Sequence, residues 1–365
     1  MTGGPYGRGK APERACMKIG EWPEVDRRLW QDALAPTDPF EPTGGTRADH
    51  SRQSNFKTEK GYGRWLTWLA TTGQLDVDLE PRERITPERV KAYVEYLESL
   101  GNGGQTILSR LQELGDFARA VAPDQSWSFI NRVASKVRAQ TVPVRDKRAK
   151  LATTPELLTL GLSLMDNATQ ETTPRLAALS YRDGLIIALL ALRPLRRRNL
   201  AGLVLGHTVV EVGDGWMLRI PGEETKTHQP IEMPWPAVLV PHLLTYIATY
   251  RPILAALQNR WASPVGDALW VSSHGSPMTQ MALYDQIRQR ASEGLGKAVN
   301  PHLFRDAAAT TMAVEDPLHV RLVSPLLGHR DQQTAERFYQ QATALEAHRE
   351  FTEVLALISK DDNRR

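Results

Sequence analysis

The chain has 365 residues, of which 41% are hydrophobic and 24% are charged. This composition is typical of a globular protein and excludes a disordered or fibrous one, and the length is too great for one ordinary core, so we expect two domains with extensions. The net charge of +3 does not by itself indicate a nucleic-acid partner, so the distribution of charge along the chain matters more than the total.

Cysteine content and hydropathy restrict the compartment. Cys16 is the single cysteine, which excludes an intramolecular disulfide and argues against a zinc cluster. The longest apolar run, Leu185 to Leu192, is far shorter than the roughly 20 residues that a membrane helix needs. The glycine- and proline-rich N-terminus lacks the apolar core of a signal peptide. We therefore expect a cytoplasmic protein that does not bind a membrane.

Residues 1–50 are rich in glycine and proline, with one possible short helix near Trp22 to Leu34. We interpret them as an N-terminal extension, partly disordered, that would order only on a partner.

Residues 51–140 carry helical signals and are predicted to form a compact helical domain. Phe56 to Leu69 is one helix, and Thr86-Pro87-Glu88 places a cap before a proline at the first helical position. Apolar residues then recur at helical spacing on both sides of the glycine-rich breaker at residues 101–104. These residues are Val90, Tyr93, Val94 and Leu97 before the breaker, and Ile107, Leu111, Leu114 and Phe117 after it.

Residues 141–150 are the predicted linker, and they belong to a basic run. Between Arg132 and Lys150 stand seven basic residues against the single acid Asp146. Such a run is either a solvated helix face or a segment that follows DNA phosphates, and its coincidence with a linker favours phosphate contacts. The predicted DNA-binding residues are Lys136, Arg138, Arg145, Lys147 and Arg148.

Residues 151–365 are predicted to form a second domain, beginning with a helix at Thr154-Pro155-Glu156. Short strands at Thr208 to Val212, Trp216 to Ile220 and Ile231 to Met233 indicate a small antiparallel sheet within a helical domain. The pattern returns to helix from Val240 onward. An apolar stripe near the C-terminus packs either on its own domain or on a neighbouring protomer, and it consists of Phe351, Val354, Leu355 and Ile358.

Six residues of the second domain carry the chemistry of interest. A guanidinium at the edge of a rigid core, such as Arg196 after the apolar helix, is suited to clamp a phosphate. Lys226 between two strands is either an idle surface lysine or a general acid. His302 and Arg305 share a helix face. The remaining two are His329 after Gly328, and Tyr339, which core packing would also explain.

The order of these residues resembles the tyrosine recombinase family, also called the phage integrase family, over roughly residues 51 to 358. Pro194-Leu195-Arg196-Arg197-Arg198-Asn199-Leu200 matches the register of the family's first arginine motif, with Pro194 replacing glycine and Asn199 replacing an acid. In this register Arg193, Arg197 and Arg198 do not correspond to the family's catalytic arginine. Pro301 to Thr310 matches the His-x-x-Arg helix, with Phe304 and Asp306 where leucine and histidine are frequent. Leu326-Leu327-Gly328-His329 and Thr334 to Tyr339 match the last two motifs.

The resemblance implies a mainly α fold with a small antiparallel β-sheet, arranged as a two-domain DNA clamp. Its parts would be a helical, SAM-like core-binding domain and a mixed α+β catalytic domain. The implied catalytic residues are Tyr339, Arg196, Lys226, His302, Arg305 and His329.

The implied activity is site-specific DNA recombination or integration in a bacterial cytoplasm, at the nucleoid, on a mobile genetic element. Tyr339 would form a 3′-phosphotyrosine bond and strands would be exchanged through a Holliday junction, with no cofactor, metal or ATP. The partners would be double-stranded DNA with a specific site and further copies of the chain, as a tetramer on DNA and a monomer or dimer when free. The alternatives are DNA relaxation of the type IB topoisomerase kind, or a non-catalytic DNA-binding protein that kept the fold.

Overall fold

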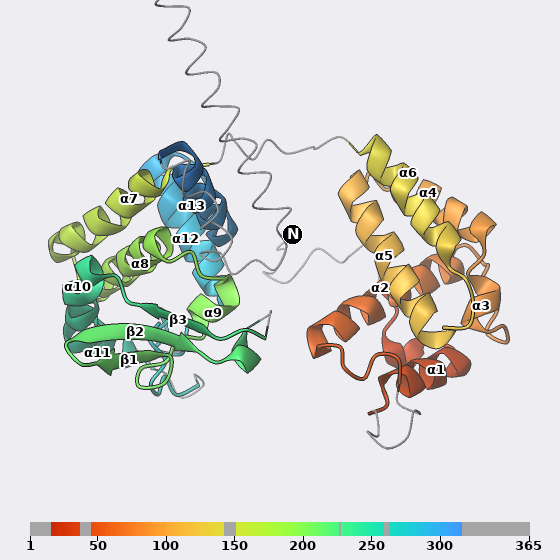
Figure 1. The fold of residues 1–365 in the computed structure, drawn as a ribbon, viewed down its shortest axis with the longest axis horizontal. Coiled ribbons are helices and arrows are strands. Elements are labelled where there is room, and N and C mark those ends of the chain that lie inside the picture. Colours follow the sequence, from red (N-terminus) through yellow and green to blue (C-terminus); the bar gives the residue numbers. More distant parts are fainter. Residues whose placement is uncertain (1–15, 37–44, 142–150, 226–227, 259–262, 316–365) are drawn as a thin grey trace, which may run out of the picture. The chain divides into compact units, whose positions relative to one another are not determined.

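The computed structural model describes residues 16–36, 45–141, 151–225, 228–258 and 263–315. Contacts between Cα atoms divide the chain into two compact units, Met1–Arg145 and Asp146–Arg365. Both are mainly helical, and the second contains a small antiparallel sheet (Figure 1), so the predicted mainly α fold is confirmed.

The first unit is built from helices around an aromatic core. Tyr62 stacks on Phe117 with ring centroids 3.4 Å apart, and Trp22 meets Tyr62 edge-on at 5.1 Å. The predicted helix start at Thr86 is confirmed, because its hydroxyl accepts the N–H of Arg89. The helices are α1 (Glu24–Leu34), α2 (Arg52–Thr71), α3 (Pro81–Arg84), α4 (Pro87–Ser99), α5 (Gly104–Val121) and α6 (Ser128–Gln140).

The N-terminal segment 16–36 is part of this core rather than an extension that waits for a partner. Trp22 and Trp30 are buried in the same cluster as α2 and α5. Asp26 forms a fully buried ion pair with Arg84 and also accepts a hydrogen bond from the Tyr62 hydroxyl at 2.8 Å. Burial raises the pKa of Asp26, and the charge of Arg84 opposes that rise. The glycine and proline content of residues 1–50 predicts an extension, and for residues 16–36 this prediction is wrong. The buried positions in this segment recur at helical spacing from residue 22 to residue 33.

The second unit begins with α7 (Thr154–Asp166). Its cap is Thr153, one residue before the predicted start, and Thr153 and Glu156 form a reciprocal capping box. The other helices of eight or more residues are α8 (Pro174–Leu192), α12 (Gln280–Leu295) and α13 (Pro301–Glu315), and the shorter ones are α9 (Arg197–Ala201), α10 (Val240–Thr245) and α11 (Arg251–Ala255). None of the described helices combines the length and apolarity needed to cross a bilayer.

The three predicted strands are confirmed as a sheet in the order β1 (Val209–Val212), β2 (Gly215–Ile220) and β3 (Ile231–Pro234). Both pairs are antiparallel, with Val209 opposite Leu218 and Ile220 opposite Ile231. Val209, Leu218 and Ile220 are buried in the core of the unit. The β2–β3 pairing thereby fixes the two ends of the connection between these strands, where Ile220 lies opposite Ile231.

Helices α7 and α8 pack with glycine against glycine. A Cβ atom placed on Gly184 would lie 2.6 Å from the Gly161 carbonyl oxygen, and one on Gly161 would lie 2.6 Å from the Ala188 nitrogen. Real Cβ atoms do not approach backbone so closely, so the two helices could not pack as they do with larger residues at these positions. This contact fixes α8, whose C-terminal end leads into the turn that carries Arg196.

We expect Gly184→Ala to lower the free energy of unfolding by about 1–3 kcal/mol, because the added methyl group overpacks the α7–α8 contact. Calorimetric unfolding of the full chain measures this loss. Gly215→Ala is the matched control, since its Cβ would meet nothing closer than 3.9 Å. A Gly184→Ala protein as stable as the control would show that the two helices separate easily.

Candidate active site

Arg196 lies in the turn between α8 and α9, at the edge of the core. It is the residue that caps α9, with extended backbone angles, and its carbonyl accepts the N–H of Leu200 at 2.9 Å. Leu195 and Leu200 on either side are buried, whereas Arg196 itself is half-buried. Two buried leucines therefore anchor the backbone on either side of the half-buried Arg196.

Helix α13 presents His302 and Arg305 from its first two turns. The side-chain oxygen of Asn300 accepts the N–H of His302 at 3.0 Å and that of Leu303 at 3.4 Å. Asn300 followed by Pro301 is a strong helix start, because asparagine satisfies the first N–H groups and proline has no N–H to satisfy. With this start His302 is exposed, whereas Leu303 and Phe304 are buried in the core.

Arg305 joins α13 to the turn that carries Arg196. Its Nη1 donates a hydrogen bond of 2.6 Å to the carbonyl oxygen of Pro194, and the side chain is buried. Burial, and next the positive charge of Arg196, lower the pKa of Arg305 to about 10, and the carboxylate of Asp306 acts in the opposite direction. Arg305 remains charged at neutral pH. The structure therefore brings Arg196 and Arg305 close enough to repel each other, although more than 100 residues separate them in the sequence.

Two of the other arginines near this turn, Arg193 and Arg197, have structural contacts. Arg193 donates to the carbonyl oxygens of Pro234 at 3.1 Å and Leu192 at 3.0 Å, and burial lowers its pKa. Arg197 lies over the ring of Tyr284 at 5.5 Å, and Arg198 is exposed. These contacts tie the turn to β3 and α12.

Asn199 is buried in α9, where the family motif has an acid. Its side-chain nitrogen has no hydrogen-bond partner among the described residues. An unsatisfied buried amide costs about 1–3 kcal/mol. The residue therefore supplies no carboxylate to Arg196, and its amide N–H groups are unpaired within the described core.

A buried ionic network behind the site was not predicted from the sequence. Asp183 on α8 accepts hydrogen bonds from Arg182 at 2.9 and 2.5 Å and from Arg290 on α12 at 3.0 Å. Arg182 also donates to the carbonyl oxygen of Val271 at 2.7 Å. The network joins α8 to α12 and to the segment before α12, and α8 leads into the turn that carries Arg196. An Arg-Asp pair within an apolar helix was the available sequence signal.

Three of the six predicted catalytic residues, Lys226, His329 and Tyr339, lie outside the described residues, so the structure places only Arg196, His302 and Arg305. The predicted DNA contacts Arg145, Lys147 and Arg148 and the C-terminal apolar stripe (Phe351, Val354, Leu355 and Ile358) also lie outside them.

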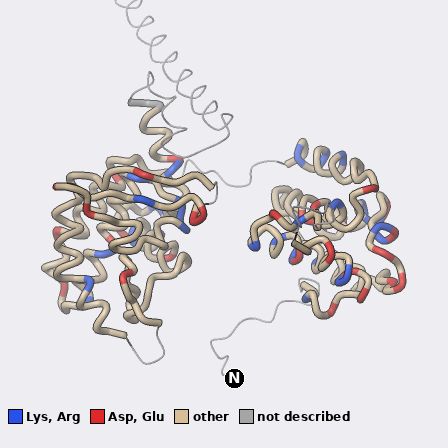
Figure 2. Tube along the Cα trace, turned by 60° about the horizontal axis from the view of Figure 1, so that its bottom comes forward, with Lys and Arg blue, Asp and Glu red and all other residues tan. Residues whose placement is uncertain are grey.

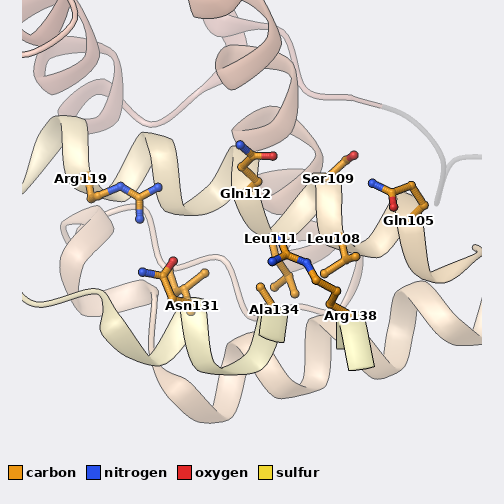
Figure 3. Close-up of a pocket in the computed structure, with 10 residues that line it drawn as sticks. Gln105, Leu108, Ser109, Leu111, Gln112, Arg119, Asn131, Ala134 and Arg138 are labelled. Carbon is orange, nitrogen blue, oxygen red and sulfur yellow. The ribbon is translucent and has the colours of Figure 1, made fainter. Parts of the chain in front are cut away.

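Lys136 and Arg138 lie on α6, within the predicted helical domain, and both are exposed. This helix carries basic residues and no acid (Figure 2). Arg138 borders a groove of about 290 Å³ between α5 and α6. Figure 3 shows Gln105, Ser109 and Gln112 on the α5 side of the groove and Arg138 on the α6 side.

Comparison with known proteins identifies the family. The profile of the phage integrase family matches residues 162–345, which is just over half of the chain and contains all six predicted catalytic positions. The chain therefore belongs to the phage integrase family.

The relatives and a solved structure agree with this membership. A tyrosine recombinase XerD from Chlorobaculum tepidum is 24% identical over 291 residues, which are 79% of this chain and 83% of the relative. One from Staphylococcus saprophyticus is 28% identical over 168 residues, 46% of this chain and 52% of the relative, so the match spans about half of that relative's length. The Tn1549 transposon integrase, solved in complex with transposon right end DNA, has a TM-score of 0.53 at 17% identity and covers 89% of this chain and 98% of that chain. At this identity the last likeness concerns the fold.

We expect inorganic phosphate to bind at Arg196 and raise the unfolding temperature of the protein. A bound oxyanion would reduce the repulsion between the guanidinium groups of Arg196 and Arg305. A ligand at ten times its Kd adds about 1.4 kcal/mol of stability. Thermal unfolding in phosphate and in chloride at equal ionic strength measures the effect. Arg196→Gln should lose it and Arg198→Gln should keep it, whereas equal responses of the two variants would contradict a phosphate site at Arg196.

Proposed function

We propose that the protein is a site-specific DNA recombinase or integrase that cleaves and rejoins DNA strands through a covalent bond to Tyr339. The observation that carries this proposal is the hydrogen bond from Arg305 to the Pro194 carbonyl, which holds a buried guanidinium near the half-buried Arg196. Membership in the phage integrase family, with a matched region that contains Lys226, His329 and Tyr339, supports it.

Each residue has a role that its chemistry allows. The Tyr339 oxygen attacks phosphorus, a Tyr–phosphate bond forms at the 3′ end, and the bond from phosphorus to the 5′ oxygen breaks. His302 accepts the phenol proton, and Lys226 donates a proton to the departing 5′ oxygen. Arg196 and Arg305 stabilise the negative charge that develops on the non-bridging oxygens, and His329 adds a hydrogen bond. The bond energy is kept in the phosphotyrosine, so a new 5′ hydroxyl restores the strand without ATP or metal.

Strand exchange needs more than one active site. We infer that further copies of the chain assemble on two DNA sites, as a tetramer, and pass strands through a Holliday junction. The two units of each copy would grip the duplex as a clamp, and the C-terminal stripe would join protomers or pack on its own unit. Such a protein would act on chromosomal DNA in a bacterium, on behalf of a mobile element.

The α5–α6 groove is the part of the helical unit best suited to touch DNA. Lys136 and Arg138 supply phosphate contacts, which set affinity rather than sequence preference. Gln105 and Gln112 on α5 are exposed amides, and amides of this kind read adenine edges in the major groove. The Tn1549 transposon integrase, which shares the fold, was solved with DNA.

Covalent trapping tests the proposed activity and identifies the DNA site at the same time. The wild-type chain is incubated with a library of randomised duplexes that are nicked near each candidate cut. The short fragment that carries the new 5′ hydroxyl then dissociates, which prevents religation. We expect protein–DNA adducts that survive denaturation and share one sequence, and Tyr339→Phe should form none.

The outcomes separate this function from its alternatives. Adducts of unrelated sequence, with relaxation of arbitrary plasmids, would indicate a topoisomerase. The absence of any adduct from a protein that still binds one duplex specifically would indicate a binding protein and would refute the recombinase.

Removal of the basic side chains of α6 should weaken binding to the trapped duplex and reduce its dependence on salt. For Lys136→Ala/Arg138→Ala we expect the slope of log K against log salt to fall by about 1.8, at about 0.9 per phosphate contact. Titration at several salt concentrations measures the slope. Arg82→Ala/Lys91→Ala removes the same charge from exposed positions on α3 and α4 and should leave the slope unchanged, so equal slopes for the two double variants would contradict the assignment.

A further inference from the structure

Arg197 follows Arg196 directly in the chain, but its side chain lies against a different helix. Arg196 is the cap of α9, and Arg197 is the first residue of that helix. The guanidinium carbon of Arg197 lies 5.5 Å from the centre of the Tyr284 ring, in the second turn of α12. Arg196 instead lies close enough to Arg305 on α13 for its charge to lower the pKa of Arg305. The two neighbouring guanidinium groups therefore take part in different contacts.

Both members of the contact between Arg197 and Tyr284 stand on helices that are anchored in the core. Leu200 on α9 is buried, and its carbonyl oxygen accepts the indole N–H of Trp270 at 2.9 Å. On α12, the residues Leu283 and Ile287 beside Tyr284 are also buried. The arginine and the ring are therefore held together before any ligand binds.

Arg197 differs from two other arginines of this unit because it has no carboxylate partner in the described part of the chain. Arg182 and Arg290 both form ion pairs with Asp183. Among the described residues no such carboxylate lies within ion-pair distance of Arg197, whose side chain is half-buried. Its positive charge is therefore available to an anion from outside the protein.

Contact with an aromatic ring prepares a guanidinium for binding phosphate. The ring attracts the cation and covers one of its faces, while the N–H groups remain at the edge of the guanidinium plane. Two of these groups can donate parallel hydrogen bonds to phosphate oxygens. Because the ring already restricts the side chain, less conformational entropy is lost when the phosphate binds.

We propose that Arg197, held by Tyr284, binds the DNA phosphate next to the one that is cleaved. The inference rests on the proposed recombinase function, in which Arg196 and Arg305 bind the scissile phosphate. Consecutive Cα atoms are about 3.8 Å apart, which is similar to the roughly 3.4 Å that separates successive phosphates of one strand along the DNA axis. The phosphate within reach of Arg197 is therefore a neighbour on the same strand. Tyr284 touches no DNA and acts as a positioning residue for Arg197.

Methylphosphonate substitution tests this assignment, because it replaces one charged phosphate oxygen with a methyl group. Each phosphate of the duplex identified by covalent trapping is replaced in turn, and equilibrium binding of the full chain is measured. We expect the wild-type chain to lose about tenfold in affinity when the phosphate at Arg197 is replaced. Arg197→Ala should bind the unmodified duplex about tenfold more weakly and should lose nothing further at this one phosphate.

Two substitutions locate the contact along the strand. Arg196→Gln should lose its sensitivity at the scissile phosphate, directly beside the phosphate at which Arg197→Ala becomes insensitive. Arg198→Ala removes the same charge from the next residue, which is exposed, and should keep the wild-type sensitivity at every phosphate. If Arg197→Ala does not fold, Arg197→Gln, which keeps more of the side chain, makes the same test.

Substitutions of Tyr284 test its positioning role. Tyr284→Phe keeps the aromatic ring and should bind the duplex within about twofold of the wild-type affinity. Tyr284→Leu removes the ring and should weaken binding about threefold. In the Arg197→Ala chain the same Tyr284→Leu change should have no further effect, because the residue acts through the arginine.

The proposal is overturned if Arg197→Ala remains sensitive at every phosphate, or if it becomes insensitive at the phosphate of Arg196 or at a distant one. Equal affinities of Tyr284→Phe and Tyr284→Leu would also overturn it, because the ring would then have no role in binding.

Failure of the recombinase function has a different result, because these measurements require binding and not cleavage. If the wild-type chain forms no adduct, the scan is made on the duplex that it binds most tightly. An Arg197-dependent phosphate beside an Arg196-dependent one would then support the contact although the recombinase is refuted. If the chain binds no duplex specifically, both proposals fail.

Discussion

The central described contact of the candidate site is the hydrogen bond from the Arg305 guanidinium to the carbonyl oxygen of Pro194, because it joins α13 to the turn that carries Arg196. It holds two positive charges near each other at the edge of a low-dielectric core, where their repulsion and the burial of Arg305 both oppose folding. The surrounding structure supplies the compensating free energy: α7 and α8 pack backbone to backbone, and Asp183 bridges α8 to α12. In the proposed function, an anion such as a DNA phosphate would reduce the repulsion between these two guanidinium groups.

Much of the fold could be predicted from local signals in the sequence. The helix starts at Thr86 and near Thr154 follow from capping residues and proline, and the three strands follow from short apolar runs between turns. The placement of Arg196 at the end of an apolar helix was also readable, because a chain that leaves a core helix reaches the surface within a few residues. All of these features depend on neighbours that are close in the sequence.

The features that could not be predicted depend on residues that are distant in the sequence. No local pattern indicates that Arg305 bonds to the carbonyl of Pro194 or that Arg290 reaches Asp183. Asn199 is an intermediate case: the sequence showed the loss of an acid, and the structure adds that the amide is buried with its nitrogen unsatisfied. Asn300 is an exception, because an asparagine followed by proline is a local helix-start signal that the sequence alone offers.

The burial of Trp22 and Trp30 in the helical unit has a consequence for the order in which the chain folds. Both tryptophans are synthesised well before Phe117, which contacts each of them in the finished core. At synthesis rates of about 5–20 residues per second, α1 waits several seconds with its apolar face uncovered. The helical unit therefore reaches its native core only once α5, which carries Phe117, has emerged from the ribosome.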